Sequence, residues 1–336
     1  MRRAARIGIG VLGFVFLIVV GGSATVVVLH LQGMEAAERA WREYDPPGIE
    51  DLGETRSLAI LPLSTWHTAG DHLRGEAGLS YLVRTDSMTI LFDLGLNADQ
   101  ADPSPLLHNM EALGVSLDEV DAVVISHNHV DHVGGLPWLK AGSFSLGNEQ
   151  VDLEDKEVYV PVPLTYPGVE PVHTPDPTVL GPGVATTGTI PRRLFIGTVE
   201  EQALVVNVAD RGLILIVGCG HQTVPKLVGR TEAVFSQPIH GIVGGLHFPV
   251  PEGRGTLFGI DVQRRLASGK GPWRPVSAAD VERAIAILED RSPGLVGLDG
   301  HDSSDEAIDL FRQAFGPAYR EVEVGTWIRV GGEGVP

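Results

Sequence analysis

The sequence has very little cysteine, no internal repeats and a shortage of basic residues. Cys219 is the single cysteine among the 336 residues, so the chain cannot form an internal disulfide bond. No segment of about 20–50 residues recurs, which argues against a solenoid or a propeller. Coiled-coil heptads and low-complexity tracts are also absent from the sequence. These absences favour an ordinary globular protein with one large domain or two smaller ones.

Acidic residues clearly outnumber basic ones. The chain has 25 lysines and arginines against 43 aspartates and glutamates, which gives a net charge of −18 at pH 7. Proteins that bind nucleic acid need clustered basic side chains to neutralise the phosphates. We therefore expect a small-molecule substrate and no nucleic-acid partner, although a nuclease with a local basic groove would still be compatible with this composition.

The N-terminus carries an apolar segment that is long enough to cross a membrane. Arg2, Arg3 and Arg6 precede an apolar run over Ile7–Leu31, which would be about 37 Å long as a helix. A hydrocarbon core needs only about 20 apolar residues, and arginines in front of the run favour a cytoplasmic N-terminus. We predict that residues 1–34 form a transmembrane helix that anchors the protein, with the catalytic domain extracytoplasmic.

Two alternatives to this anchor remain open. Residues 21–24 (Gly-Gly-Ser-Ala) form a possible cleavage site for a signal peptide, and cleavage would give a secreted protein. The apolar run nevertheless continues past that site through Val26–Leu29. A buried core helix is the other interpretation, but a charged stretch follows the run directly. Residues 35–55 are charged and contain Pro46 and Pro47, so we predict a linker to a catalytic domain over residues 56–336.

From Arg56 onward, short β-branched runs bounded by Gly, Asp or Pro alternate with helical patterns, which predicts an α/β fold. The expected strands are Leu58–Leu61, Leu79–Val83, Thr89–Phe92, Ala122–Ser126, Ala203–Val208, Leu213–Val217, Ile239–Val243, Leu295–Leu298 and Thr326–Val330. The expected helices are Pro105–Leu113, Ala278–Leu288 and Asp305–Phe315. Residues 141–193 are rich in Pro and Gly, so they predict an insertion or long loop region that is a candidate substrate-facing element.

The strongest chemical signal directly follows one of these strands. His127, His129, Asp131 and His132 lie within a single short turn. Imidazole nitrogens and carboxylate oxygens are common ligands of zinc. The first two histidines can face one metal ion, while Asp131 and His132 can turn toward a second, as in two-metal sites. A polar loop whose histidines only cap and pair is the alternative, but four such groups so close together indicate a common metal-binding role.

This turn resembles the His-x-His-x-Asp-His motif of the metallo-β-lactamase superfamily at every position. The resemblance implies an αββα sandwich with the metal site at the edge between two sheets. Residues 76–83, 90–95 and 109–115 also resemble that fold. Three later segments are similar to the branch that contains dihydropterin ribofuranosylaminobenzene phosphate synthase, and they are Thr186–Arg192, Val217–His221 and Ile242–His247.

The remaining metal ligands have to come from the ends of other strands. His221 follows one expected strand and is predicted to complete the site of His127 and His129. His301 follows another and is predicted to join the second site, although His247 could take its place or contact the substrate instead. We assign Asp131 and His247 as the catalytic residues. The predicted metal ligands are His127, His129, Asp131, His132, His221 and His301.

One position departs from the superfamily pattern. Many members carry a bridging aspartate in a Gly-Asp context, whereas the corresponding stretch here reads Gly218-Cys219-Gly220. Cys219 could bind metal as a soft thiolate or could be a small buried residue, which is the usual role of a free cysteine. The departure leaves the second metal ion in question.

The combined expectation is a metal-dependent hydrolase with two divalent metal ions. Zinc is the expected metal, with iron or manganese as alternatives, and a metal-bound hydroxide would attack an ester, a phosphoester or a related small molecule. An iron-containing redox protein of the same fold would need the same ligands. A non-catalytic metal-binding module would be expected to have lost ligands from the intact motif.

Overall fold

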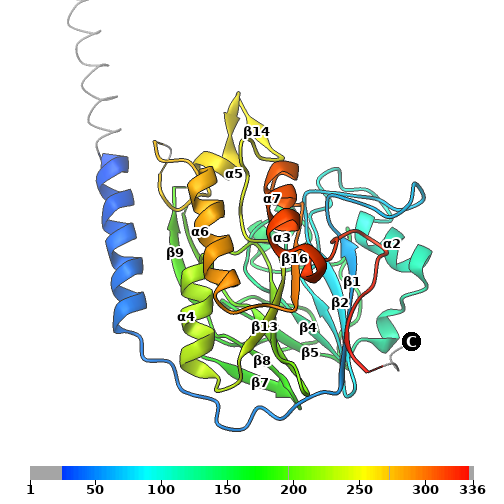
Figure 1. Cartoon of the computed structure of the whole chain (residues 1–336). Helices are drawn as coiled ribbons and strands as arrows, with labels where there is room; N and C mark the ends of the chain where they lie inside the picture. Colours follow the sequence, from blue (N-terminus) through cyan, green and yellow to red (C-terminus); the bar gives the residue numbers. More distant parts are fainter. Residues whose placement is uncertain (1–24, 196, 272, 333–336) are drawn as a thin grey trace, which may run out of the picture.

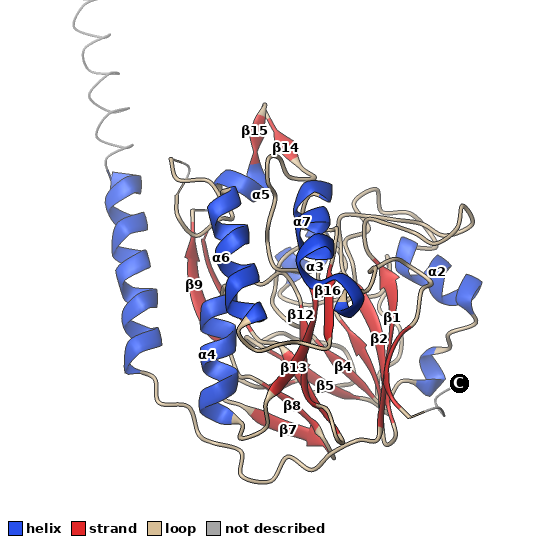
Figure 2. Cartoon of the chain, viewed as in Figure 1, coloured by secondary structure: helices blue, strands red, loops and turns tan. Residues whose placement is uncertain are grey.

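The computed structural model describes residues 25–195, 197–271 and 273–332. Two β-sheets pack face to face and helices cover both outer faces (Figure 2). The first sheet has the strand order β17-β1-β2-β3-β4-β5-β6 and the second has the order β16-β13-β12-β11-β8-β7. This is the predicted αββα sandwich.

The first sheet consists of β1 (Ser57–Ser64), β2 (Ser80–Thr85), β3 (Thr89–Phe92), β4 (Ala122–Val124), β5 (Glu157–Val160), β6 (Val172–His173) and β17 (Ile328–Gly331). The second consists of β7 (Thr178–Gly181), β8 (Val184–Thr186), β11 (Leu204–Val208), β12 (Gly212–Val217), β13 (Ile239–Gly244) and β16 (Leu295–Leu298). Two separate hairpins are β9 (Ile190–Leu194) with β10 (Gly197–Glu201), and β14 (Thr256–Leu257) with β15 (Ile260–Asp261). The labelled helices are α2 (Pro105–Leu113), α3 (Leu136–Ala141), α4 (Val224–Val234), α5 (Val262–Arg265), α6 (Ala278–Glu289) and α7 (Asp305–Phe315).

Both faces of the central strands are buried, which explains their continuous apolar runs. Every residue of β1 is buried. Leu58 and Ile60 lie in the core between the two sheets, while Leu61 and Leu63 face the core under α2 and α3. The strand period of two therefore places apolar side chains in two separate cores.

Parallel strands bring the candidate ligands to one edge of the sandwich. In the first sheet β3, β4 and β5 are mutually parallel, and in the second sheet β12, β13 and β16 are. The loops that leave the carboxyl ends of these strands begin at Asp93, Ile125, Pro161, Gly218, Gly245 and Asp299. Ligands of open α/β sheets bind at such an edge. The strand topology thus places the predicted metal ligands together.

The described part of the chain contradicts the predicted transmembrane helix. No helix among residues 25–195, 197–271 and 273–332 is both long and apolar enough to cross a membrane. Residues 25–43 form a helix, but its second half carries charged side chains, and one of them, Glu38, contacts the domain. The predictions of membrane anchoring, and of the extracytoplasmic placement that we inferred from it, are therefore not supported and are withdrawn. Residues 1–24, which hold most of the predicted anchor, lie outside the described residues.

The helix over residues 25–43 lies beside α4 and β9 (Figure 1). Glu38 accepts hydrogen bonds from Lys226 at 2.8 Å and from Arg192 at 3.3 Å. The Trp41 ring lies 5.4 Å from both Lys226 Nζ and Arg230 Cζ. Residue 34, where we predicted the anchor to end, falls inside this helix, and the division into anchor, linker and catalytic domain stays a prediction.

We expect Trp41→Ala to lower the free energy of unfolding by about 1–2 kcal/mol, because each cation–π contact contributes about 0.5–1 kcal/mol. Urea denaturation followed by circular dichroism measures the change. Glu43→Ala, an exposed change on the same helix, is the matched control. Equal unfolding free energies for the two variants would show that the helix does not stabilise the domain through Trp41.

Candidate metal centre

The turn after β4 is fixed by a buried carboxylate from the neighbouring strand end. Asp93 accepts hydrogen bonds from the backbone N–H of Ser126 at 2.7 Å and from its hydroxyl at 2.6 Å. It also accepts one from His132 Nδ1 at 2.7 Å. Since a carboxylate only accepts, Nδ1 donates this hydrogen bond, and His132 Nε2 faces the centre. Carboxylate partners of this kind orient metal-binding histidines.

His301 is oriented in the same way from the other sheet. Asp299 accepts hydrogen bonds from His301 Nδ1 at 2.8 Å and from its backbone N–H at 2.7 Å. The Asp299 carboxylate also binds the hydroxyls of Thr65 and Tyr81. All these side chains are buried, so the ring has one available orientation, with Nε2 toward the centre.

A third carboxylate, which the sequence analysis did not identify, holds the loop after β12. Glu201 accepts hydrogen bonds from three successive backbone N–H groups, those of Cys219 at 2.9 Å, Gly220 at 2.8 Å and His221 at 2.7 Å. Burial raises the pKa of Glu201 to about 7, against the opposing effect of these hydrogen bonds. The contact fixes the backbone that presents both Cys219 and His221.

Several buried ring nitrogens have no hydrogen-bond partner among the residues that the structure describes. Those around the centre are Nε2 of His127, Nδ1 of His247 and both nitrogens of His221. A buried polar atom without a partner costs roughly 1–3 kcal/mol, so several in one place need a common explanation. A metal ion that accepts their lone pairs provides one, and the donors present fit such an ion.

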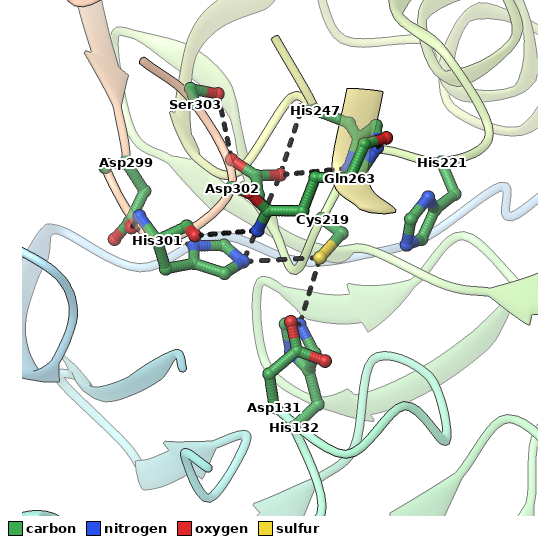
Figure 3. Close-up of polar contacts among 12 residues, drawn as sticks. Asp131, His132, Cys219, His221, His247, Gln263, Asp299, His301, Asp302 and Ser303 are labelled. Atoms are coloured by element: carbon green, nitrogen blue, oxygen red, sulfur yellow. Dashed lines mark hydrogen bonds and ion pairs between the residues drawn. The ribbon is translucent and has the colours of Figure 1, made fainter. Parts of the chain in front are cut away.

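Cys219 lies at the middle of this group. Its Sγ is 3.1 Å from His132 Nε2 and 3.2 Å from His301 Nε2 (Figure 3). Four sets of side chains bring one ligand atom each within 4.8 Å of one another, and Cys219 belongs to three of them. The sets are Asp131, His132, Cys219 and His301; His127, Cys219 and His221; His127, His129 and Asp131; and Cys219, His247 and Asp302.

Burial and neighbouring charges separate the histidines into two classes. Burial lowers the pKa of His127 and His221 well below the usual value and lowers those of His129 and His247 to about 4. These rings are therefore neutral near pH 7, which is the form that binds metal. Burial also opposes the charged form of His301, but the carboxylates of Asp302 and Asp299 outweigh it and raise the pKa to about 10.

The structure brings all the predicted site residues together. The six predicted ligands belong to the sets around Cys219 or directly beside them. His247 faces the same centre, since its ring lies 4.6 Å from that of His221, and its Nε2 donates to the Gln263 carbonyl at 2.9 Å. The assignment of metal-binding and catalytic roles to these residues stays a prediction.

The family model described as the metallo-beta-lactamase superfamily matches residues 73–226, which include the histidine-rich turn and Cys219 to His221. Over residues 73–226 the chain matches the metallo-β-lactamase superfamily. The predicted αββα fold and the predicted superfamily are thereby confirmed.

Individual relatives agree with this match. The chain is 25% identical over 264 residues to a 7,8-dihydropterin-6-methyl-4-(beta-D-ribofuranosyl)-aminobenzene-5'-phosphate synthase of Methanocaldococcus jannaschii, which covers 66% of this chain and 88% of the relative. Among solved structures, Tm1679, described as a metal-dependent hydrolase of the beta-lactamase superfamily, superposes with a TM-score of 0.54 at 21% identity. That match covers 82% of this chain and 100% of Tm1679, and it supports the fold.

We expect Glu201→Gln to lower the free energy of unfolding by about 2–3 kcal/mol, because an amide N–H₂ would replace one acceptor oxygen opposite a buried N–H group. Chemical denaturation of the full-length chain measures this loss. Glu200→Gln on the same strand is the matched control, since Glu200 is more exposed. An effect no larger than that of the control would mean that Glu201 does not hold the loop after β12.

Proposed function

We propose that this protein is a metal-dependent hydrolase with two divalent metal ions, most simply zinc. His127, His129 and His221 would hold one ion, and Asp131, His132 and His301 would hold the other. One observation carries the proposal. Buried histidine nitrogens that have no hydrogen-bond partner among the described residues lie together within a set of candidate metal ligands. Divalent cations at such a site lower the pKa of water toward 7 and polarise a carbonyl or phosphoryl oxygen.

Asp131 and His247 are the proposed catalytic residues. Asp131 lines a cavity of about 360 Å³ and is less buried than His127 and His132, so it can hold a nucleophilic water by accepting its proton in a hydrogen bond. His247 donates from Nε2 to Gln263, and its Nδ1, which lies 3.9 Å from an Asp302 carboxylate oxygen, has no hydrogen-bond partner among the described residues. That nitrogen can accept a hydrogen bond from the substrate or from water at the same centre.

The proposed substrate class is an ester, a phosphoester or a related small molecule. The relative from Methanocaldococcus jannaschii is named for a phosphate-bearing product, which supports testing phosphoesters beside carboxylic esters. An iron-dependent redox reaction would use the same ligands, so the metal content separates the two functions.

We expect the full-length chain to contain about two zinc ions. His129→Ala should lower this number and abolish ester or phosphodiester hydrolysis, because the site of His127, His129 and His221 loses a ligand. Elemental analysis and a hydrolysis assay on the same preparations measure both. His173→Ala is the matched control, since His173 is exposed and contacts a backbone carbonyl. Iron in place of zinc would point to redox chemistry, and a folded chain that binds no metal would contradict the proposal.

We further propose that Cys219 is a ligand shared by the two ions, in the place where many superfamily members carry an aspartate. Its sulfur lies near ring nitrogens of both proposed sites, and the backbone that carries it is fixed by Glu201. A thiolate is a softer ligand than a carboxylate and favours zinc or cobalt over magnesium or calcium.

Loading the protein with Co²⁺ tests this role without an activity assay. We expect a thiolate-to-cobalt charge-transfer band in the near-ultraviolet that disappears in Cys219→Asp, while the aspartate variant still binds the metal. Identical near-ultraviolet spectra for the two proteins would contradict this role. Cys219 is the single cysteine in the chain, so no other thiolate could give the band.

A further inference from the structure

Two cavities adjoin the proposed metal centre and share lining residues. One has a volume of about 360 Å³ and is lined by Leu96, Val130, Leu139 and Val262 together with candidate ligands. The other has a volume of about 230 Å³ and extends between α4, α6 and β9. His221 and His247 line both cavities, so the centre lies where the two cavities meet.

The second cavity concentrates positive charge in a strongly acidic chain. Three cationic side chains line it, namely Arg192 from β9, Lys270 from the segment before α6, and Arg283 from α6. In the whole sequence, by contrast, acidic residues outnumber basic ones by 43 to 25. Asp280 pairs with Lys270, and Glu38 pairs with Arg192. Arg283 has no ion-pair partner within the described ranges. The cavity therefore keeps a local excess of positive charge after its own carboxylates are counted.

Arg192 is held in place before any ligand arrives. Its side chain is only 15% exposed, and its buried Nε has no hydrogen-bond partner among the described residues. A Cβ on Gly269 would come within 2.3 Å of this Nε, so the loop beside Lys270 can approach the guanidinium because residue 269 is glycine. Burial lowers the pKa of Arg192, and an anionic partner would offset the cost of burying its charge.

The amino end of α4 adds to this environment. Thr223, Val224 and Pro225 line the cavity at the start of the helix, and no side chain of the described residues caps it. Free backbone N–H groups and the helix dipole favour negative charge at such an end. The helix end supports the three cationic side chains but would not define a site alone.

We propose that this cavity binds a terminal anionic group of the substrate, a phosphate or a carboxylate, through Arg192, Lys270 and Arg283. The apolar cavity on the other side would hold the remainder of the substrate, so the bond to be hydrolysed lies at His221 and His247 between them. The inference rests on the proposed hydrolase function and narrows its substrate class to anionic esters or phosphoesters that also have an apolar portion.

Calorimetric titration of the full-length chain with inorganic phosphate, and separately with acetate, tests the site. We expect at least one of the two anions to bind, and the one that binds more tightly identifies the group. Arg283→Gln and Arg192→Gln should each weaken that binding by about tenfold, through loss of a charge-assisted hydrogen bond. Arg39→Gln removes an exposed arginine from the N-terminal helix and should leave the affinity unchanged.

Arg283→Gln and Arg192→Gln differ in how far each substitution is expected to affect folding. Arg283 is exposed, so its substitution should not affect folding, whereas Arg192 contacts Glu38. Absence of binding by both anions, or equal affinities for wild type and Arg283→Gln, would overturn the inference.

Metal content and hydrolysis of the same preparations separate this inference from the proposed function. If the protein catalyses hydrolysis but Arg283→Gln leaves its affinity for the anion unchanged, the anion site alone is refuted. Arginine-dependent anion binding in a chain that holds no metal would refute the hydrolase proposal and leave the anion-binding cavity standing.

Discussion

Three buried carboxylates, each bonded to a different loop, are the constraint on which the proposed centre depends. Asp93 holds the turn after β4, Glu201 holds the loop after β12, and Asp299 holds His301 after β16. Each accepts hydrogen bonds from backbone N–H groups, and two also fix the tautomer of a histidine. Without them the loops would carry buried N–H groups with no acceptor, and the ring nitrogens would not face one point.

The strands and the carboxylates act together. Parallel pairing in both sheets brings the strand ends to one edge, which places the loops within several ångströms of each other. The carboxylates then set the final orientation of each ring. This division explains how residues as distant in sequence as His132 and His301 both come within about 3 Å of Cys219 Sγ. It also gives the centre two open sides, one apolar and one basic, for a substrate.

Local sequence patterns were sufficient for much of this arrangement. The helices Pro105–Leu113 and Asp305–Phe315 were predicted with the observed bounds, because each has a serine before it and a glycine after it. The clustered ligands of the histidine-rich turn were visible for the same reason, since their spacing is local. His221 and His301 followed from their positions at strand ends. Asp93 lies within residues 90–95, one of the segments that resemble the superfamily fold.

Other features depended on contacts that no local pattern reveals. Glu201 is an isolated acid in sequence, and its partners begin 18 residues later. The helix α4 was missed because Gly229 interrupts its pattern, and residues 141–193, expected as an insertion or loop region, contain several strands of both sheets. The predicted anchor was wrong for a related reason. Hydropathy describes the apolar run, but it does not reveal that the helix continues past residue 34 to residue 43 and contacts the folded domain through Glu38 and Trp41.

The most direct test of the central claim is a crystal structure of the full-length, zinc-loaded protein with anomalous diffraction measured at the zinc absorption edge. The account predicts two anomalous peaks on either side of Cys219 Sγ, one among His127, His129 and His221 and the other among Asp131, His132 and His301. No peak at this edge of the sandwich, or a single peak remote from Cys219, would contradict it.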